Sequence, residues 1–395
     1  MIKHHIVEIS EKVYHVGVRD RNRRLFDALI TLPKGTTYNS YLVIGEDKKA
    51  LIDTVNPGFE KELESRVREI VDPSDLDYVI MNHAEPDHSG AIPFLMSINS
   101  KAKLVTTGRG ARMAQIFYNV PSDRIKIVSD QETIDLGGRI LRFIDAPMLH
   151  WPETMFTYLQ EKQILFTCDF FGAHVAEGNY EDDIKDLAVH AKSYFGEIMM
   201  PYRVMGEKAL EKIKNLDIKI IAPSHGPIYK NPEKILELYR QWVHGETKQK
   251  AILIYATMWK STEKMILQMA ETLASEKIEV ALYNLNSSDI GDIARDLVDS
   301  RALVLGAPTM LGGIHPIAQY ATYLVKILKP PAKFGVVLNS YGWGKGAIQH
   351  VQEILGPSKL EVIGRMEING PPTEEHVKQI IELGKTLAEK IKSIS

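Results

Sequence analysis

Short apolar runs separated by polar turns dominate roughly the first 250 residues of the chain. Runs with the length and side chains of β-strands cover residues 41–45, 50–54, 78–82, 103–107, 140–146, 155–159, 163–169 and 219–225. Amphipathic stretches between them predict helices at 59–70, 91–98, 109–117, 181–199 and 232–247. This irregular alternation favours a layered sheet protein with helices on its outer faces.

The pattern of apolar and polar residues changes near Lys250, where predicted strands and helices begin to alternate strictly. Five apolar runs follow, starting with 251–256, and each is followed by a segment of helical period; the last helix starts at Thr373. This order predicts a doubly wound parallel sheet. We therefore expect a two-domain α/β protein, with domains at 1–249 and 250–395, because 395 residues exceed one ordinary core.

Composition narrows the classes of function. The chain is 44% hydrophobic and 25% charged, which is typical of a globular protein, and its net charge of −3 offers no basic surplus for nucleic acid or a membrane surface. No apolar run has membrane-spanning length and no secretion signal is visible, so we expect a cytoplasmic protein. The single cysteine, Cys168, excludes a disulfide framework and a four-thiolate metal site. Any metal would be held by histidine and carboxylate, and Cys168 is expected to point into the core.

The strongest local signal is the run His83-Ala84-Glu85-Pro86-Asp87-His88, directly after the strand at 78–82. Four potential ligands in six residues can converge on one small volume if the run leaves the strand as a loop, whereas a helix would place some of them on other faces. The alternative is a polar capping loop. A buried charged group must be paired or bound to a metal, so we interpret the run as part of a metal site.

Three more residues stand at the polar end of an apolar strand or just beyond it: His150, Asp169 and His225. Each alone would more often be a loop or cap residue. Together with the run they make seven potential ligands, which is more than one metal needs and favours a two-metal site with a bridging carboxylate. Added carboxylate suits iron or manganese better than zinc, and Glu85 is the informative residue.

The His-x-Glu-x-Asp-His run, with the three later residues, resembles the flavodiiron family, also called A-type flavoproteins. Its first domain is similar to the metallo-β-lactamase αββα sandwich, and hydrolases of that fold usually carry histidine where Glu85 stands. The resemblance therefore implies redox iron rather than hydrolytic zinc. It implies one iron bound by His83, Glu85 and His150, a second bound by Asp87, His88 and His225, and a bridge from Asp169.

Two other positions gain meaning from the resemblance. Tyr194 matches a tyrosine near the open coordination face, where it could hydrogen-bond a ligand; the alternative is a core tyrosine. Asp27 stands where many relatives have histidine, so their substrate preference does not carry over directly.

The second domain carries a candidate phosphate loop. Residues between the first strand and its helix offer hydroxyls and free backbone N–H groups at a helix N-terminus, although a capping box would use similar residues. Loops after the third and fourth strands should lie beside it at the switch point of the sheet. The candidate residues are Thr257, Met258, Trp259, Lys260, Ser261 and Thr262, then Pro308, Thr309, Met310, Leu311 and Gly312, and finally Asn339, Ser340, Tyr341, Gly342, Trp343 and Gly344. The arrangement resembles flavodoxin, and FMN is favoured over FAD because no dinucleotide fingerprint is present.

These features lead to the hypothesis of a flavodiiron oxidoreductase that reduces oxygen to water, nitric oxide to nitrous oxide, or both. Electrons would pass from an external donor, rubredoxin by family resemblance, through FMN to the diiron site. The resemblance also implies a head-to-tail homodimer or a dimer of dimers, in which FMN of one subunit faces the irons of the next. The alternatives are a dizinc hydrolase of the same fold and a flavodoxin-like electron carrier with a structural metal domain.

Overall fold

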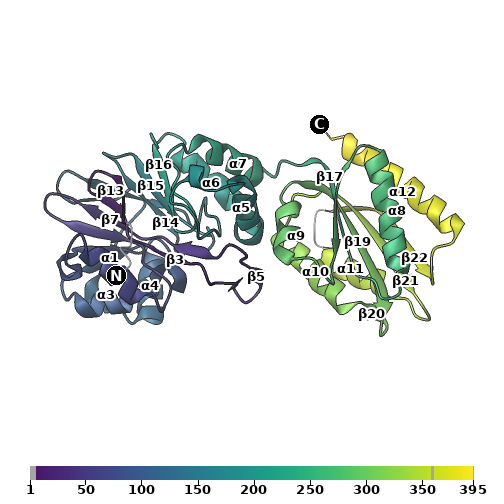
Figure 1. Ribbon diagram of the computed structural model, residues 1–395, viewed down its shortest axis with the longest axis horizontal. Coiled ribbons are helices and arrows are strands. Elements are labelled where there is room, and N and C mark those ends of the chain that lie inside the picture. The colour runs from purple at the N-terminus through teal and green to yellow at the C-terminus, as the bar shows by residue number, and fades with distance from the viewer. Residues whose placement is uncertain (1–5, 357–359, 395) are drawn as a thin grey trace. The chain divides into compact units, whose positions relative to one another are not determined.

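The computed structural model describes residues 6–356 and 360–394 (Figure 1). It divides into two compact units, of which the first comprises residues 1–194 and 202–240 and the second comprises 195–201 and 241–395. Within the described part of the chain, no helix combines the length and apolar character that a membrane span requires.

Two sheets form the centre of the first unit. The larger runs in the order β1-β2-β7-β8-β9-β10-β11 and the smaller in the order β12-β13-β14-β15-β16. Their bounds are β1 Val7–Ser10, β2 Val13–His15, β7 Tyr41–Ile44, β8 Lys49–Ile52, β9 Tyr78–Ile80, β10 Lys103–Thr106, β11 Ile125–Ile127, β12 Thr133–Asp135, β13 Ile140–Asp145, β14 Met155–Leu159, β15 Ile164–Cys168 and β16 Ile220–Pro223. Two small ribbons pair β3 (Val18–Asp20) with β6 (Thr36–Tyr38), and β4 (Leu25–Phe26) with β5 (Ile30–Thr31).

The two sheets pack face to face. One apolar cluster joins side chains of the larger sheet, such as Val43 and Ile80, to side chains of the smaller sheet, such as Phe143 and Phe166. A second cluster lies between the other face of the larger sheet and its helices, among them Leu63 and Ala114. Strands buried on both faces become continuous apolar runs, which explains the pattern read from the sequence. The layers therefore form an αββα sandwich.

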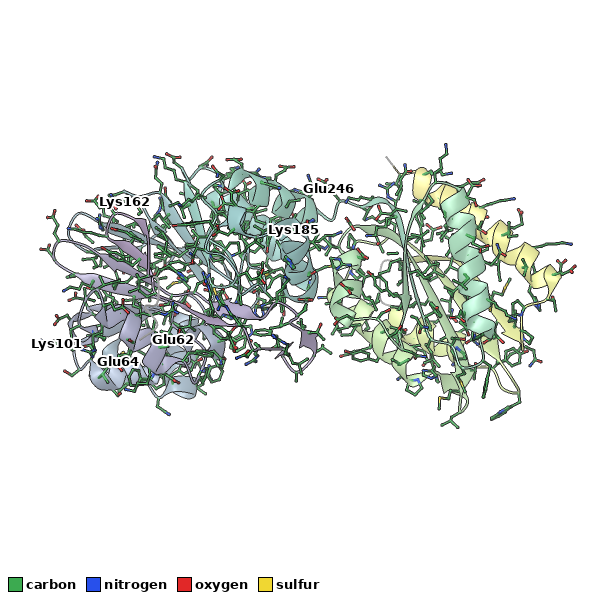
Figure 2. All side chains as sticks on the ribbon, viewed as in Figure 1. Glu62, Glu64, Lys101, Lys162, Lys185 and Glu246 are labelled. Carbon is green, nitrogen blue, oxygen red and sulfur yellow. The ribbon has the colours of Figure 1, made fainter. Side chains whose placement is uncertain are left out.

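The helices of the first unit differ in places from those that the sequence predicts. They are α1 Glu60–Arg68, α2 Pro86–Ser89, α3 Ile92–Ile98, α4 Gly108–Tyr118, α5 Leu187–Tyr194, α6 Arg203–Ile213 and α7 Glu233–His244, with 3-10 turns at Pro73–Asp75, Ser122–Arg124, Glu181–Asp183 and Met200–Tyr202. The single helix predicted at 181–199 is wrong, since a 3-10 turn precedes α5 and a π-helical segment, Phe195–Met199, follows it. Charged side chains such as Lys101 and Glu64 lie on the outside of this unit (Figure 2), and Glu64 pairs with Arg68 one helical turn away.

The second unit is a parallel sheet in the order β18-β17-β19-β21-β22, with helices on both faces (Figure 1). Its elements are β17 Lys248–Tyr255, α8 Ser261–Ser275, β18 Glu279–Asn284, α9 Ile290–Leu297, β19 Ser300–Met310, β20 Gly313–Ile314, α10 Pro316–Leu328, β21 Phe334–Tyr341, α11 Ala347–Leu355, β22 Glu361–Asn369 and α12 Glu374–Lys392. The predicted doubly wound, flavodoxin-like sheet is confirmed, and it has one addition, a short β20 that turns back antiparallel on β19. An apolar cluster that includes Met269 of α8 and Leu387 of α12 covers one face.

Candidate metal centre and cofactor loops

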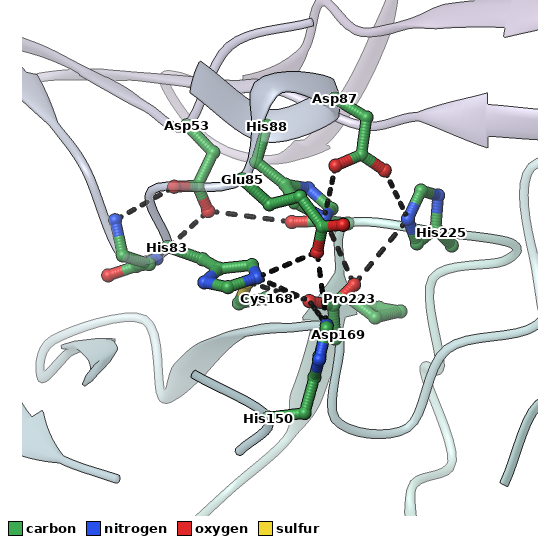
Figure 3. Close-up of polar contacts among 12 residues, drawn as sticks. Asp53, His83, Glu85, Asp87, His88, His150, Cys168, Asp169, Pro223 and His225 are labelled. Atoms are coloured by element: carbon green, nitrogen blue, oxygen red, sulfur yellow. Dashed lines mark hydrogen bonds and ion pairs between the residues drawn. The ribbon is translucent and has the colours of Figure 1, made fainter. Parts of the chain in front are cut away.

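Strand ends from both sheets of the first unit converge on one point. His83 follows β9 of the larger sheet, while Asp169 directly follows β15 and His225 follows β16 of the smaller sheet. Figure 3 shows these side chains pointing toward one another. The run after β9 is not the loop predicted from the sequence, because Pro86 starts one short helical turn, α2, that carries Asp87 and His88. A single turn is too short to separate them onto opposite faces, so both still face the site.

The first group of potential ligands is held around Glu85. The Oε2 atom of Glu85 lies 3.1 Å from His83 Nε2 and 3.1 Å from His150 Nε2. Asp169 Oδ2 completes the group, at 3.4 Å from His83 Nε2 and 3.6 Å from His150 Nε2. One ligand atom from each of these four residues lies within 4.8 Å of the others, which is close enough to surround one metal ion.

The second group consists of Asp87, His88 and His225. The two carboxylate oxygens of Asp87 lie 3.3 Å from His88 Nε2 and 3.1 Å from His225 Nε2. Asp169 faces this group with its other oxygen, Oδ1, which is 3.0 Å from His88 Nε2 and 3.4 Å from His225 Nε2. The carboxylate of Asp169 thus presents one oxygen to each group, which is the geometry of a bridge between two metal ions.

The residues of this site fit a pair of hard metal ions. Both carboxylate oxygens of Asp87, and the Nε2 atoms of His88 and His225, are buried without a hydrogen-bond partner among the described residues. Burying such groups without hydrogen bonds is costly, and metal ions would satisfy them. Cys168 also lies within reach of His88 and Asp169, but burial raises the pKa of its thiol well above its ordinary value, which disfavours a thiolate there. Imidazole and carboxylate are the remaining donors, and that mixture suits iron.

A carboxylate that the sequence did not reveal supports the first group. Glu153 is buried, and its Oε1 lies 2.8 Å from His83 Nδ1 while it accepts a hydrogen bond from the Ala84 N–H at 2.8 Å. A carboxylate on Nδ1 fixes the tautomer of a histidine and leaves Nε2 free to bind metal. No strand-end pattern marks Glu153, because it lies inside the connection between β13 and β14.

A second buried carboxylate joins three strand ends beneath the site. Asp53 follows β8, accepts hydrogen bonds from the backbone N–H and side-chain amide of Asn82, and lies 3.4 Å from Ser224 Oγ (Figure 3). Burial raises the pKa of Asp53 to about 6. The apolar strand that ends in Asp53 is the same signal that marked Asp169, so the sequence pattern could have found this residue.

The second group is supported from the side of β6. His225 Nδ1 lies 2.6 Å from the carbonyl oxygen of Thr37 and 3.2 Å from Thr36 Oγ1. Tyr194 donates a hydrogen bond to Asp169 Oδ1 at 2.7 Å, so this tyrosine contacts the site and is not merely a core residue. His174, which the sequence analysis missed, packs its ring 4.8 Å from that of Tyr194 and 5.1 Å from that of His225. Nothing in the local sequence pattern marks His174.

Two residues that the sequence singled out lie at the margin of the site. Asp27 is exposed on the β4–β5 hairpin, where its backbone has a positive φ of 48°. Desolvation by the surrounding residues, followed by repulsion from the carboxylates of Glu85 and Asp87, raises the pKa of this surface carboxyl group above its ordinary value. Cys168 is buried, as expected, and its thiol contacts Asp169 Oδ2 at 3.6 Å.

The candidate cofactor segments of the second unit lie together at the carboxyl ends of three neighbouring strands. β17 pairs with β19, and β19 pairs with β21, all parallel. Thr262 Oγ1 and Ser340 Oγ are 2.8 Å apart, and the amide of Asn339 donates to Thr309 Oγ1 at 3.1 Å. These bonds connect all three segments. Pro308, Thr309 and Met310 lie in the extended β19, and Asn339, Ser340 and Tyr341 in β21, where the sequence led us to expect loops.

Large apolar side chains are left exposed around these segments. Trp259, Leu311 and Trp343 are 87%, 88% and 88% exposed, one from each segment. Thr257 Oγ1 and Asn339 Oδ1, by contrast, are buried and have no hydrogen-bond partner among the described residues. Exposed aromatic rings beside unpaired polar atoms and a helix N-terminus match what a flavin mononucleotide requires, with a flat apolar ring and a phosphate.

Comparisons with known proteins agree with this geometry. Residues 36–226 match the model of the ODP family beta lactamase. A nitric oxide reductase of Moorella thermoacetica is 38% identical over 394 residues, covering 98% of each chain. The rubredoxin oxygen:oxidoreductase of Desulfovibrio gigas superposes with a TM-score of 0.95 at 28% identity, over 98% of this chain and 99% of that one. The flavodiiron protein of Giardia intestinalis has a TM-score of 0.93 at 28% identity, over 98% and 97%.

The chain therefore belongs to the flavodiiron protein family. The predicted fold, a metallo-β-lactamase-like sandwich followed by a flavodoxin-like sheet, and the predicted class of enzyme, an oxidoreductase, are confirmed.

Proposed function

We propose that this protein reduces oxygen to water, nitric oxide to nitrous oxide, or both, with electrons that pass from an external donor through FMN to a diiron centre. The observation that carries the proposal is Asp169, which offers one oxygen to each of two His and carboxylate groups. Relatives named for nitric oxide reduction and for oxygen reduction support both gases, and the name of the second supports a rubredoxin-type donor.

In this proposal His83, Glu85 and His150 hold one iron, Asp87, His88 and His225 hold the other, and Asp169 bridges them. When bound, the two irons would supply the change of redox state that gas reduction needs. The chain supplies geometry, because Glu153 orients His83 and the Thr37 carbonyl orients His225. Tyr194 donates its hydroxyl hydrogen to Asp169 Oδ1, so its role in this proposal is to orient the carboxylate that would lie between the two irons.

FMN is proposed to bind at the three connected segments of the second unit. The hydroxyls of Thr257 and Thr262, with the first N–H groups of α8, would hold the phosphate. Trp259 and Trp343 would flank the flavin ring, since both are exposed at the ends of adjacent strands. In this proposal residues 1–249 form the diiron domain and residues 250–395 the FMN domain. A head-to-tail homodimer would bring the FMN of one subunit near the irons of its partner.

The rival functions are a dizinc hydrolase and an electron carrier. The names of the relatives favour neither, and Glu85, an added carboxylate, favours iron over zinc. A hydrolase would contain zinc and no flavin, whereas the proposed enzyme should contain about two irons and one FMN per chain.

The test is metal and flavin quantification, followed by anaerobic reduction and consumption assays with both gases. Glu85→Ala should abolish gas consumption while the donor still reduces the flavin, because it removes a ligand of one iron only. Glu69→Ala, an exposed glutamate on the same unit, is the matched control and should behave as the parent. Retention of full gas consumption in Glu85→Ala would refute the diiron assignment, and zinc in a colourless protein would refute the function.

A further inference from the structure

Thr36 lies between two histidines on the side of the second ligand group. Its Oγ1 is 3.2 Å from Nδ1 of His225 and 3.0 Å from Nδ1 of His174. Thr36 is fully buried and His174 is 9% exposed. The hydroxyl therefore connects a proposed metal ligand to a histidine for which the proposed function has no role.

The direction of each hydrogen bond follows from the acceptors. His225 Nδ1 lies 2.6 Å from the carbonyl oxygen of Thr37, which can only accept, so Nδ1 carries the hydrogen. Thr36 Oγ1 is then an acceptor toward His225, and its own hydrogen points to His174 Nδ1. The other acceptor within reach, the Thr37 carbonyl, lies 3.3 Å from Thr36 Oγ1 against 3.0 Å for His174 Nδ1, so the shorter contact assigns the hydrogen to His174. His174 Nδ1 is thus an acceptor, and a neutral His174 carries its hydrogen on Nε2.

The Nε2 atom of His174 is buried and has no hydrogen-bond partner among the described residues. The ring of His174 packs 4.8 Å from Phe26, 4.8 Å from Tyr194 and 5.1 Å from His225. A buried N–H without an acceptor is costly, and a ligand with an acceptor atom would satisfy it.

We propose that His174 uses its Nε2–H as a fixed hydrogen-bond donor to a small ligand held at the second group, and that Thr36 is a positioning residue that sets the tautomer of His174. The ligand class is a diatomic gas or small anion with a terminal acceptor atom. This inference rests on the proposed function. It adds a donor on the same side as Tyr194, whose own hydroxyl hydrogen is already donated to Asp169 Oδ1.

Azide is the probe, because it is a small anion with terminal acceptor atoms. The iron- and FMN-containing protein is oxidised and titrated with sodium azide, and the visible absorption band reports binding. His174→Phe keeps the ring volume without a donor, and His174→Asn places its amide near the Nδ1 position. Both should raise the azide dissociation constant about tenfold, as the loss of one hydrogen bond predicts. His174→Gln, which can place an N–H near the Nε2 position, should stay within about twofold of the parent.

The Thr36 variants test the positioning step separately. Thr36→Val removes the hydroxyl and should raise the azide dissociation constant several-fold, whereas Thr36→Ser keeps the hydroxyl and should restore parental binding. In steady state, Thr36→Val should raise KM for the gas more than it lowers kcat. A merely structural role would lower the melting temperature and iron content without this rescue by serine, so both are measured for every variant.

The tautomer itself is read from long-range ¹H–¹⁵N correlation spectra of the full chain loaded with diamagnetic zinc. The expected signal is an Nε2–H tautomer for His174, which Thr36→Val should shift toward a mixture. A wild-type Nδ1–H tautomer, or parental azide affinity in folded, iron-loaded His174→Phe and His174→Asn, would overturn the inference. If the wild-type protein consumed neither gas, the proposed function would fail, while the tautomer spectrum would still decide the assignment of Thr36 and His174.

Discussion

The carboxylate of Glu153 offers the sharpest test of how the chain prepares its metal site. One of its oxygens, Oε1, serves both His83 Nδ1 and the Ala84 N–H, each at 2.8 Å, and all three groups are buried. Glu153→Gln can keep that oxygen in place as an acceptor but removes the negative charge. The imidazole of His83 then becomes a weaker ligand, because a carboxylate on the far nitrogen raises its basicity.

The expected loss is about 10- to 100-fold in iron affinity, the usual effect of replacing such an outer partner. At about 1.4 kcal/mol per tenfold, this corresponds to roughly 1.4–2.8 kcal/mol of binding free energy. Glu153→Ala should go further, because it leaves the Ala84 N–H without its acceptor in a buried position, which adds about 1–3 kcal/mol of destabilisation.

The assay is competition for iron against chelators of graded affinity at one fixed pH, with the melting temperature measured in parallel. Glu69→Gln on the exposed surface controls for the change of net charge. If Glu153→Gln holds iron as tightly as the parent does, with an unchanged melting temperature, then the charge on Glu153 does not govern His83 and the reasoning fails.

Three further outcomes are expected. Lys250→Met should cost about 1–3 kcal/mol in urea unfolding, since it removes the buried ammonium 2.7 Å from the Asp296 carboxylate and leaves that carboxylate only Tyr283 and Arg295. Burial alone would raise the pKa of Asp296, but the hydrogen bond from Lys250 lowers it. The pair therefore stabilises the fold above the ordinary pKa of aspartate, and this stabilisation is lost as pH falls through the lowered pKa. In acid, the free energy of unfolding of Lys250→Met should consequently depend less steeply on pH than that of the parent. Thr257→Val should weaken FMN binding about tenfold by flavin fluorescence, with Thr257→Ser near the parent, and equal affinity in both would exclude Thr257 from the phosphate site. Removing metal with a chelator should lower the melting temperature of the first unit, because a ligand present at about 1,000 times its dissociation constant stabilises by roughly 4 kcal/mol, and an unchanged transition would argue against metal in this unit.

The sequence could reveal the proposed ligands because each one stands at the end of an apolar strand or just beyond it. Because the end of a strand has a defined place in its sheet, the polar side chain that follows it also has a defined place, and the local sequence is enough to identify it as a potential ligand. The same reasoning applies to the second unit, where strict alternation of strand and helix restricts the sheet to a few doubly wound orders, all of which place ligands at the carboxyl ends of the strands.

Residues whose role depends on contacts between distant parts of the chain were out of reach. Glu153 and His83 are separated by 70 positions, and Thr36 and His174 by 138. The helix predicted at 181–199 failed for another reason, since helical period continues past Tyr194 while the hydrogen-bond pattern widens to a π-helix. Periodicity records which side chains are apolar and does not distinguish these backbone patterns.

The seven proposed ligands come from both sheets of the sandwich, and this has a consequence for how the protein matures. Neither sheet alone carries all the ligands of both metal ions, because His83 follows a strand of the larger sheet and His225 follows a strand of the smaller one. Both iron sites can therefore be completed only after the sheets have come together, and bound iron then stabilises that closure. In an iron-starved cell the second unit of a newly made chain would be folded, while the two sheets of the first unit would separate more often. Proteases cleave chains that open locally in this way. The supply of iron would then set the abundance of the protein as well as its activity.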